Sequence, residues 1–266
     1  MLFGFNLNDL VVFPLEDSEA RKHFFVGCLI YLAGFFIPIL PWLITSGYSV
    51  IIIRQVLNGE KPHLVPWDNW EALFKDGARL FGIGLVYSIP FLILIFTLFM
   101  MFFAFPFFAI SIRDSHDQGL GIVSIFYVLL SIGITILIFP LSLAMGLVIP
   151  VAEVHTIAKD DFTAGFRVKE WWPIFKKNWG GFVVAFAIGY ALFIVMTFAT
   201  QILFFTVILI CVFPIFIAAI SMYYGVVQFA MFAQAYKDGK DKLSMESAVT
   251  TGALISNSNS EAATPP

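Results

Sequence analysis

The stretch that decides the fold is residues 180–236, GGFVVAFAIGYALFIVMTFATQILFFTVILICVFPIFIAAISMYYGVVQFAMFAQAY, which contains no Asp, Glu, Lys, Arg or His. Hydrocarbon solvates charge poorly, so a run of this length without ionisable side chains is typical of a segment built for lipid. As one continuous helix it would extend ~85 Å, whereas the hydrocarbon core of a bilayer is ~30 Å thick. We therefore expect two membrane crossings here, with a turn near Thr200-Gln201-Ile202.

Three further runs, 24–53, 80–112 and 120–152, are also free of charge. The chain is 60% hydrophobic and only 12% charged, which is about half the charged share of a soluble domain. This pattern predicts an all-α, polytopic integral membrane helix bundle. Ion-coupled pumps usually keep an ionisable residue at membrane depth. Runs without any ionisable side chain therefore disfavour that class of protein.

We expect three parts: an N-terminal interfacial leader at 1–23, a transmembrane domain at 24–240 and a disordered tail at 241–266 rich in Ser, Thr, Ala and Asn. Asp17 or Ser18 is the expected N-cap of the first helix. Within the transmembrane domain the expected segments are 24–57, 78–104, 120–149, 179–203 and 207–236.

The first of these segments, 24–57, is ambiguous. As one helix it would extend ~50 Å, too long for a single crossing and short for two. Pro38 and Pro41 lie in its middle, and proline removes a backbone donor and clashes with the preceding turn. The segment is therefore either one kinked span or a helical hairpin, and only the hairpin puts both termini on the same side.

Two polar stretches between spans carry interleaved aromatic residues, at about 66–76 and 161–176. We expect each to form an amphipathic helix at the cytoplasmic membrane interface. The two stretches resemble each other, and internal duplication is common in transporters, although basic aromatic surface helices can also converge on such a pattern. The matching pairs, each separated by 101 residues, are Trp70 and Trp171, Phe74 and Phe175, Lys75 and Lys176, and Phe81 and Phe182.

The basic residues indicate an orientation. The polar stretches on one side of the membrane hold twelve Lys and Arg, whereas the 113–119 loop holds Arg113 alone. The positive-inside rule then predicts a cell-membrane protein with a cytoplasmic C-terminus. The twelve are Arg54, Lys61, Lys75, Arg79, Lys159, Arg167, Lys169, Lys176, Lys177, Lys237, Lys240 and Lys242.

No stretch predicts a cofactor, a metal or a catalytic centre. Glu153 and His155 are two residues apart, which does not put both on one helix face, and we expect them to be solvated at the interface. No basic stripe is dense enough for nucleic acid. We expect membrane lipids as partners, with other membrane protein subunits or a second copy of the chain as further candidates.

Polar residues inside the spans, such as Tyr190 and Gln228, more often bond neighbouring helices than line a lumen. Ala185 and Gly189 form a small-residue face suited to close helix packing. The expected function is a non-enzymatic accessory, scaffold or lipid- and partner-organising component. The alternative is a transporter or channel for an uncharged or lipidic solute.

Residues 46–59, SGYSVIIIRQVLNG, and 64–77, LVPWDNWEALFKDG, resemble prokaryotic membrane proteins of the family catalogued as domain of unknown function 4013. The family pattern has Gly-Tyr, an Arg, a glycine turn, Leu-Pro-x-Trp-Asp and Leu-Phe-x-Asp-Gly. One departure is that the proline comes one place late, at Pro66, with Val65 in its slot. The matching positions are Gly47, Tyr48, Arg54, Gly59, Leu64, Trp67, Asp68, Leu73, Phe74, Asp76 and Gly77.

The second half is similar through DFTAGFRV at 161–168 and AQAYKDG at 233–239, so the resemblance covers roughly 20–240. It implies a multi-spanning membrane protein, with no established activity and no catalytic residue. The candidate interface and motif residues are Gly47, Tyr48, Arg54, Trp67, Asp68, Trp70, Phe74, Asp76, Gly77, Phe166, Trp171 and Trp172.

Overall fold

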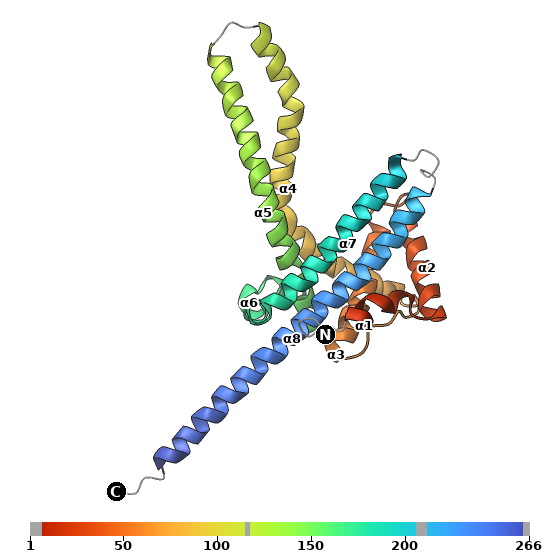
Figure 1. Ribbon diagram of the computed structural model, residues 1–266, viewed down its shortest axis with the longest axis vertical. Coiled ribbons are helices and arrows are strands. Elements are labelled where there is room, and N and C mark those ends of the chain that lie inside the picture. The colour runs from red at the N-terminus through yellow and green to blue at the C-terminus, as the bar shows by residue number, and fades with distance from the viewer. Residues whose placement is uncertain (1–6, 115–117, 206–211, 263–266) are drawn as a thin grey trace. The chain divides into compact units, whose positions relative to one another are not determined.

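The computed structural model describes residues 7–114, 118–205 and 212–262, and every regular element in those ranges is a helix (Figure 1). The chain divides into two compact units. Unit 1 comprises Met1–Ile83 and Pro150–Pro266, and unit 2 comprises Gly84–Ile149. The two long helices α4 (Trp70–Asp114) and α5 (Gln118–Lys159) contribute to both units.

Unit 1 is organised around α8 (Phe213–Ala262), which packs against four other long or amphipathic helices. Figure 1 shows α7 running beside α8 in teal and blue. Val227, Ala230 and Met231 of α8 are completely buried in this core. The packed helices are α2 (Ser18–Ala33), α3 (Leu40–Asn58), α6 (Val168–Lys177) and α7 (Trp179–Phe205), and the short elements are α1 (Leu7–Val12), η1 (Phe13–Leu15) and η2 (Phe162–Phe166).

Residues 24–57 lie in two helices, α2 and α3, that contact each other, which corresponds to the hairpin alternative. The Asp17 carboxylate accepts a hydrogen bond from the Ala20 backbone N–H at 2.7 Å, so Asp17 is the N-cap of α2. The turn at 34–39 precedes α3, whose first turn contains Pro41. Proline is tolerated there because that N–H has no intrahelical partner.

Five described helices are long and apolar enough to cross a membrane, which confirms the expected polytopic helix bundle. α2 has 16 residues, so it extends only ~24 Å and falls short of a full crossing. The candidate spans are Leu40–Asn58, Trp70–Ala104, Ile122–Lys159, Trp179–Phe205 and Phe213–Val249.

Three expectations about element boundaries are wrong. Residues 66–76 do not form a separate surface helix, because 60–69 is irregular and α4 then continues from Trp70 to Asp114 without a break. Residues 200–202 are helical, since α7 continues to Phe205. Of the tail, 241–262 extends α8, because a helix already formed can propagate without a new nucleation step.

Unit 2 has no buried side chain among its described residues, 84–104 and 122–149. Two of its threonine hydroxyls bond within their own helix: Thr97 donates to the Ile93 carbonyl, and Thr135 donates to the Ser131 carbonyl, each at 2.8 Å. Polar side chains bonded to their own helix leave the outer surface apolar. This surface suits hydrocarbon, in which exposed backbone and hydroxyl groups would be costly.

Candidate functional site

The polar residues of unit 1 gather around two connections. The first connection, residues 59–69, joins α3 to α4, and the second connection, residues 160–167, joins α5 to α6. Both follow candidate spans, and each is held by a buried aromatic side chain. Of the twelve candidate residues, Trp67, Asp68 and Phe166 lie in the connections, and the others lie on the helices beside them.

Tyr48 holds the first connection in place. Its hydroxyl donates to the Val65 carbonyl at 2.7 Å and accepts from the Val65 N–H at 2.8 Å. Its ring stacks on Trp67 with centroids 3.9 Å apart. Trp67 in turn donates from Nε1 to the His23 carbonyl at 2.9 Å, so the first connection is tied to both α3 and α2.

Gly47 and Gly77 lie where α3 and α4 cross with their backbones in contact. A Cβ on Gly47 would lie 1.8 Å from the Leu73 carbonyl oxygen, and a Cβ on Gly77 would lie 1.7 Å from that of Leu43. No side chain fits at either position without moving a helix backbone. The glycines of the family pattern are therefore explained by helix packing.

A charged row links the two connections. Arg54 binds Asp76 through both guanidinium nitrogens, at 2.6 and 3.2 Å. Arg79 lies 3.6 Å from the same carboxylate and donates to Asp160 Oδ1 at 2.7 Å. Bidentate pairs of this kind fix orientation as well as adding energy, so the row holds the ends of α3, α4 and α5 together.

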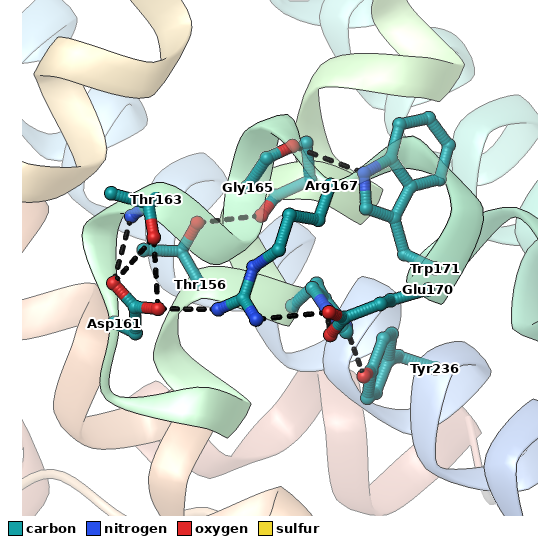
Figure 2. Close-up of polar contacts among 10 residues, drawn as sticks. Thr156, Asp161, Thr163, Gly165, Arg167, Glu170, Trp171 and Tyr236 are labelled. Atoms are coloured by element: carbon teal, nitrogen blue, oxygen red, sulfur yellow. Dashed lines mark hydrogen bonds and ion pairs between the residues drawn. The ribbon is translucent and has the colours of Figure 1, made fainter.

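The second connection is built on Asp161 (Figure 2). Its carboxylate accepts from the hydroxyl and the backbone N–H of Thr163, each at 2.9 Å, and it also pairs with Arg167. The Thr163 hydroxyl, followed by the Thr163 N–H, lowers the pKa of Asp161 below its ordinary value. Trp171 donates from Nε1 to the Gly165 carbonyl at 3.0 Å, which closes the connection against α6.

A second row of polar side chains lies at the C-terminal end of α5. His155 Nδ1 lies 2.6 Å from the Tyr236 hydroxyl, and His155 Nε2 lies 3.3 Å from Glu170 Oε2. Arg167 donates to the other Glu170 oxygen at 2.9 Å. A carboxylate, an imidazole and a phenol in a row fix the orientation of the imidazole and can pass a proton between their ends.

The expectation that Glu153 and His155 are solvated is wrong. Only 1% of His155 and 9% of Glu153 is exposed, because α5 ends inside unit 1 between α6 and α8. No group of three or more potential metal ligands occurs among the described residues. The row is therefore a buried hydrogen-bonded link between helices, which the spacing of residues along the sequence does not reveal.

Two adjoining cavities open beside this row. One has a volume of about 310 Å³ and the other of about 460 Å³. They share Ala158, Tyr236 and Lys240. The first is lined by Arg54, Leu57, Asn58, Ile157, Ala158, Tyr236, Lys237, Lys240 and Asp241, and the second by His155, Ala158, Lys159, Arg167, Glu170, Ile174, Tyr236 and Lys240.

The candidate interface residues fall into two groups. Tyr48, Trp67, Asp76 and Trp171 are buried and hold the fold. The side chains that remain exposed are Asp68, Trp70, Phe74, Phe166 and Trp172.

Local contacts order the start of α4 and the surface of α6. Asn69, the residue after Asp68, caps α4, since Asn69 Oδ1 accepts from the Ala72 N–H at 3.1 Å. Trp172 stacks on Phe175 with ring centroids 5.4 Å apart, and the Lys176 ammonium lies 5.7 Å from the Trp172 ring. These contacts order an aromatic and basic surface on α6.

The sequence missed Glu170, Tyr236 and Asp160. Tyr236 lies in the AQAYKDG stretch, so the family resemblance pointed to its neighbourhood but not to its bond with His155. Arg54 and His155 are separated by the same 101 residues as the aromatic pairs, and this spacing was the available signal.

A bundle of apolar helices joined by polar, internally bonded connections defines a multi-pass membrane protein. The chain belongs to the family described as Protein of unknown function (DUF4013), whose model matches residues 30–205 and so confirms the resemblance. The match includes both connections. No curated protein and no solved structure matches the chain.

Proposed function

We propose that the protein is a non-enzymatic accessory or scaffold subunit of the cell membrane that organises lipid and partner helices. The observation that carries this proposal is the contrast within the chain. Unit 1 buries its side chains against α8, whereas unit 2 buries none of its described side chains. A helical segment of this kind must be covered by lipid or by other helices.

The exposed side chains of unit 2 favour a partner that binds by close packing and not by hydrogen bonds. Helices associate in lipid mainly by van der Waals packing and interhelical hydrogen bonds, because hydrocarbon tails are as apolar as the side chains. Four hydroxyls of unit 2, those of Thr97, Ser131, Thr135 and Ser142, are bonded to carbonyls of their own helix. A partner would therefore bind by packing against large apolar groups such as Phe96, Phe102 and Ile136, which are 60–73% exposed.

The orientation of the scaffold follows from charge and exposed aromatic residues. The positive-inside rule places both connections and the C-terminus in the cytoplasm. Trp70, Phe74, Phe166 and Trp172 are exposed beside basic residues, which suits the headgroup layer. An impermeant thiol reagent on intact cells tests this, because a cysteine replacing Ser244 is expected to stay unlabelled until the cells are opened.

Native mass spectrometry of the full chain, extracted in a mild detergent, tests the proposal. We expect a stoichiometric protein partner on the wild type. The triple variant Phe96→Ala, Phe102→Ala, Ile136→Ala is expected to lose the partner. The matched control truncates three exposed residues of α7 in unit 1, Phe193, Phe198 and Phe205, and is expected to keep it.

Two outcomes would contradict the scaffold proposal. One is a wild-type protomer that carries no protein partner. The other is equal loss of the partner from both triple variants, because the binding would not then depend on unit 2. A thermal melt of each variant shows whether it has folded before the binding result is interpreted.

One observation favours the alternative, a transporter for an uncharged solute. Gln228 Oε1 is buried without a hydrogen-bond partner among the described residues, while Gln228 Nε2 donates to the Ala185 carbonyl at 3.4 Å. Buried carbonyl oxygens usually have a donor, and a solute hydroxyl could supply it. Uptake into proteoliposomes that is lost in Gln228→Leu but kept in Gln201→Leu, an exposed control, would favour transport.

A further inference from the structure

We infer that the two adjoining cavities beside Tyr236 bind a phosphate group, with Lys159, Lys237 and Lys240 as its charged ligands. We call these three residues the lysine site. Lys240 lines both cavities, Lys237 lines one and Lys159 lines the other. This inference does not depend on which partner unit 2 binds, because the lysine site lies wholly in unit 1.

The charges around the cavities divide into compensated and uncompensated groups. Arg54 is paired with Asp76, and Arg167 is paired with Asp161 and Glu170. Within the described part of the chain, no ion pair within 4.0 Å involves any member of the lysine site. Three lysines of the cavity walls therefore have no ion-pair partner among the described residues, and Asp241 is the lining carboxylate that no described ion pair holds.

The neighbouring side chains are fixed rather than free to collapse into the cavities. Tyr236 lines both cavities, is 2% exposed and is held by His155 at 2.6 Å. Glu170 is held by both His155 and Arg167. The lysines consequently line a space whose other walls are fixed, and preorganisation lowers the cost of binding an anion.

The lysine type and number favour phosphate as the anion. The Lys ammonium is a compact point charge that binds phosphate without the planar geometry that Arg brings to carboxylates. Three ammonium groups opposed by one carboxylate leave an excess that matches the charge of a phosphate monoester better than that of a singly charged diester. Both cavities lie at the C-terminal end of candidate span α5, beside residues 236–241 of α8, and the first cavity also lies at the end of α3. Lipid headgroups also lie at the ends of membrane spans.

The phosphate could belong to a lipid headgroup or to a free anion, and two arms of one experiment distinguish the sources. The full chain in zwitterionic phosphatidylcholine nanodiscs is titrated with inorganic phosphate. It is separately reconstituted in nanodiscs in which part of the lipid is phosphatidic acid, and native mass spectrometry counts the retained acidic lipid. Binding in either arm supports the site and identifies the source.

The test variant is Lys237→Gln with Lys240→Gln, and the matched control is Lys169→Gln with Lys176→Gln, which removes the same charge from α6 outside both cavities. We expect the test variant to bind at least about tenfold more weakly, because each charged hydrogen bond is worth more than a neutral one. The control is expected to stay within about twofold, since its lysines act only through screened long-range charge. Lys240→Arg keeps the charge and is expected to retain binding.

Three results would overturn the inference: no binding of either probe to the wild type, equal weakening in the test and control variants, or unchanged binding in the test variant. A fourth result would assign the lysines another role. Cations stabilise helix C-termini, and the Lys237 ammonium lies beside Gly59 at the end of α3, where a Cβ on Gly59 would lie 3.0 Å from Lys237 Nζ. If the test variant melts at a lower temperature by the same amount with and without phosphate, the lysines serve the helix ends and bind no phosphate.

Discussion

The first and second connections start alike and are closed differently. Gly59 and Asp160, separated by 101 residues, each follow a candidate span, and both have a positive φ, at 86° and 49°. The aromatic residues that follow at the same spacing then diverge. Trp70 is 47% exposed, whereas Trp171 is 2% exposed. A similar sequence pattern therefore supports two different packing solutions.

The difference is clearest at Gly77 and Asn178, which are also separated by 101 residues. Gly77 allows α4 to touch the backbone of α3. Asn178 instead donates from Nδ2 to the Ala235 carbonyl of α8 at 2.9 Å and accepts from Lys242 at 2.6 Å. A shared left-handed residue at the shared spacing favours internal duplication, after which each copy adapted to a different neighbour.

The largest expected effect comes from filling the first crossing. Gly77→Val should destabilise the protein by about 3 kcal/mol or more, because its Cβ would overlap a backbone carbonyl that cannot move alone. Gly180→Val is the control, since a Cβ there meets nothing within 4 Å. Thermal unfolding in detergent measures both. Equal melting temperatures would mean that the α3–α4 contact is not tight.

Asn178→Ala should be next, at about 2 kcal/mol, because it removes the side-chain hydrogen bond to the buried Ala235 carbonyl and the acceptor of the Lys242 ammonium. The loss should appear as a lower midpoint of unfolding. Asn58→Ala, at an exposed position, provides the comparison and should change the midpoint little. A small effect at Asn178 would show that α7 and α8 are held by apolar packing alone.

Substitutions of the two aromatic side chains that hold the connections should destabilise the protein by different amounts. Tyr48→Phe leaves both backbone groups of Val65 without a partner, at a cost of about 1–2 kcal/mol. Trp171→Phe removes a single hydrogen bond, the one to the Gly165 carbonyl, and should cost about 1 kcal/mol. Hydrogen exchange separates the two. Tyr48→Phe should speed exchange in 60–69 alone and Trp171→Phe in 161–167 alone, and exchange that rises in both connections would contradict their independence.

Gly59→Ala should cost about 1 kcal/mol, because an L-residue with a side chain is strained at positive φ. Gly59→Asn should cost less, since asparagine tolerates this conformation, as the aspartate at Asp160 does in the second connection. The midpoint of unfolding orders the two variants. Alanine that is tolerated as well as asparagine would show that the end of α3 can relax.

The smallest expected effect is a pH dependence confined to the second connection. Because the folded-state pKa of Asp161 is lowered, its stabilisation is present above the unfolded value of 3.8 and is lost as the pH falls through the folded value. Thr163→Val removes the hydroxyl that contributes most to this shift, so it should flatten the acid limb of the stability profile below about pH 4. Thr163→Ser should preserve it, and identical profiles for both variants would exclude the Thr163 hydroxyl as the cause.

Local chemistry explains which features could be predicted from the sequence. The charge-free runs predicted the membrane helix bundle. Lipid solvates charged side chains poorly, so a stretch without them can be recognised from its composition alone. Asp17 was predicted as an N-cap because capping needs only neighbouring residues. The family motif located Gly47, Tyr48, Arg54 and Asp76 without indicating their contacts.

The sequence by itself determined the membrane class, the family and the two polar stretches that contain the connections, because hydropathy and short motifs depend on adjacent residues. Only the tertiary structure decided which side chains meet. Tyr236 reaches His155 across 81 residues, and Arg79 reaches Asp160 across the same separation. Such pairs depend on how α4, α5 and α8 pack, and burial depends on the same packing, which is why Glu153 and His155 were expected in water and lie inside the protein.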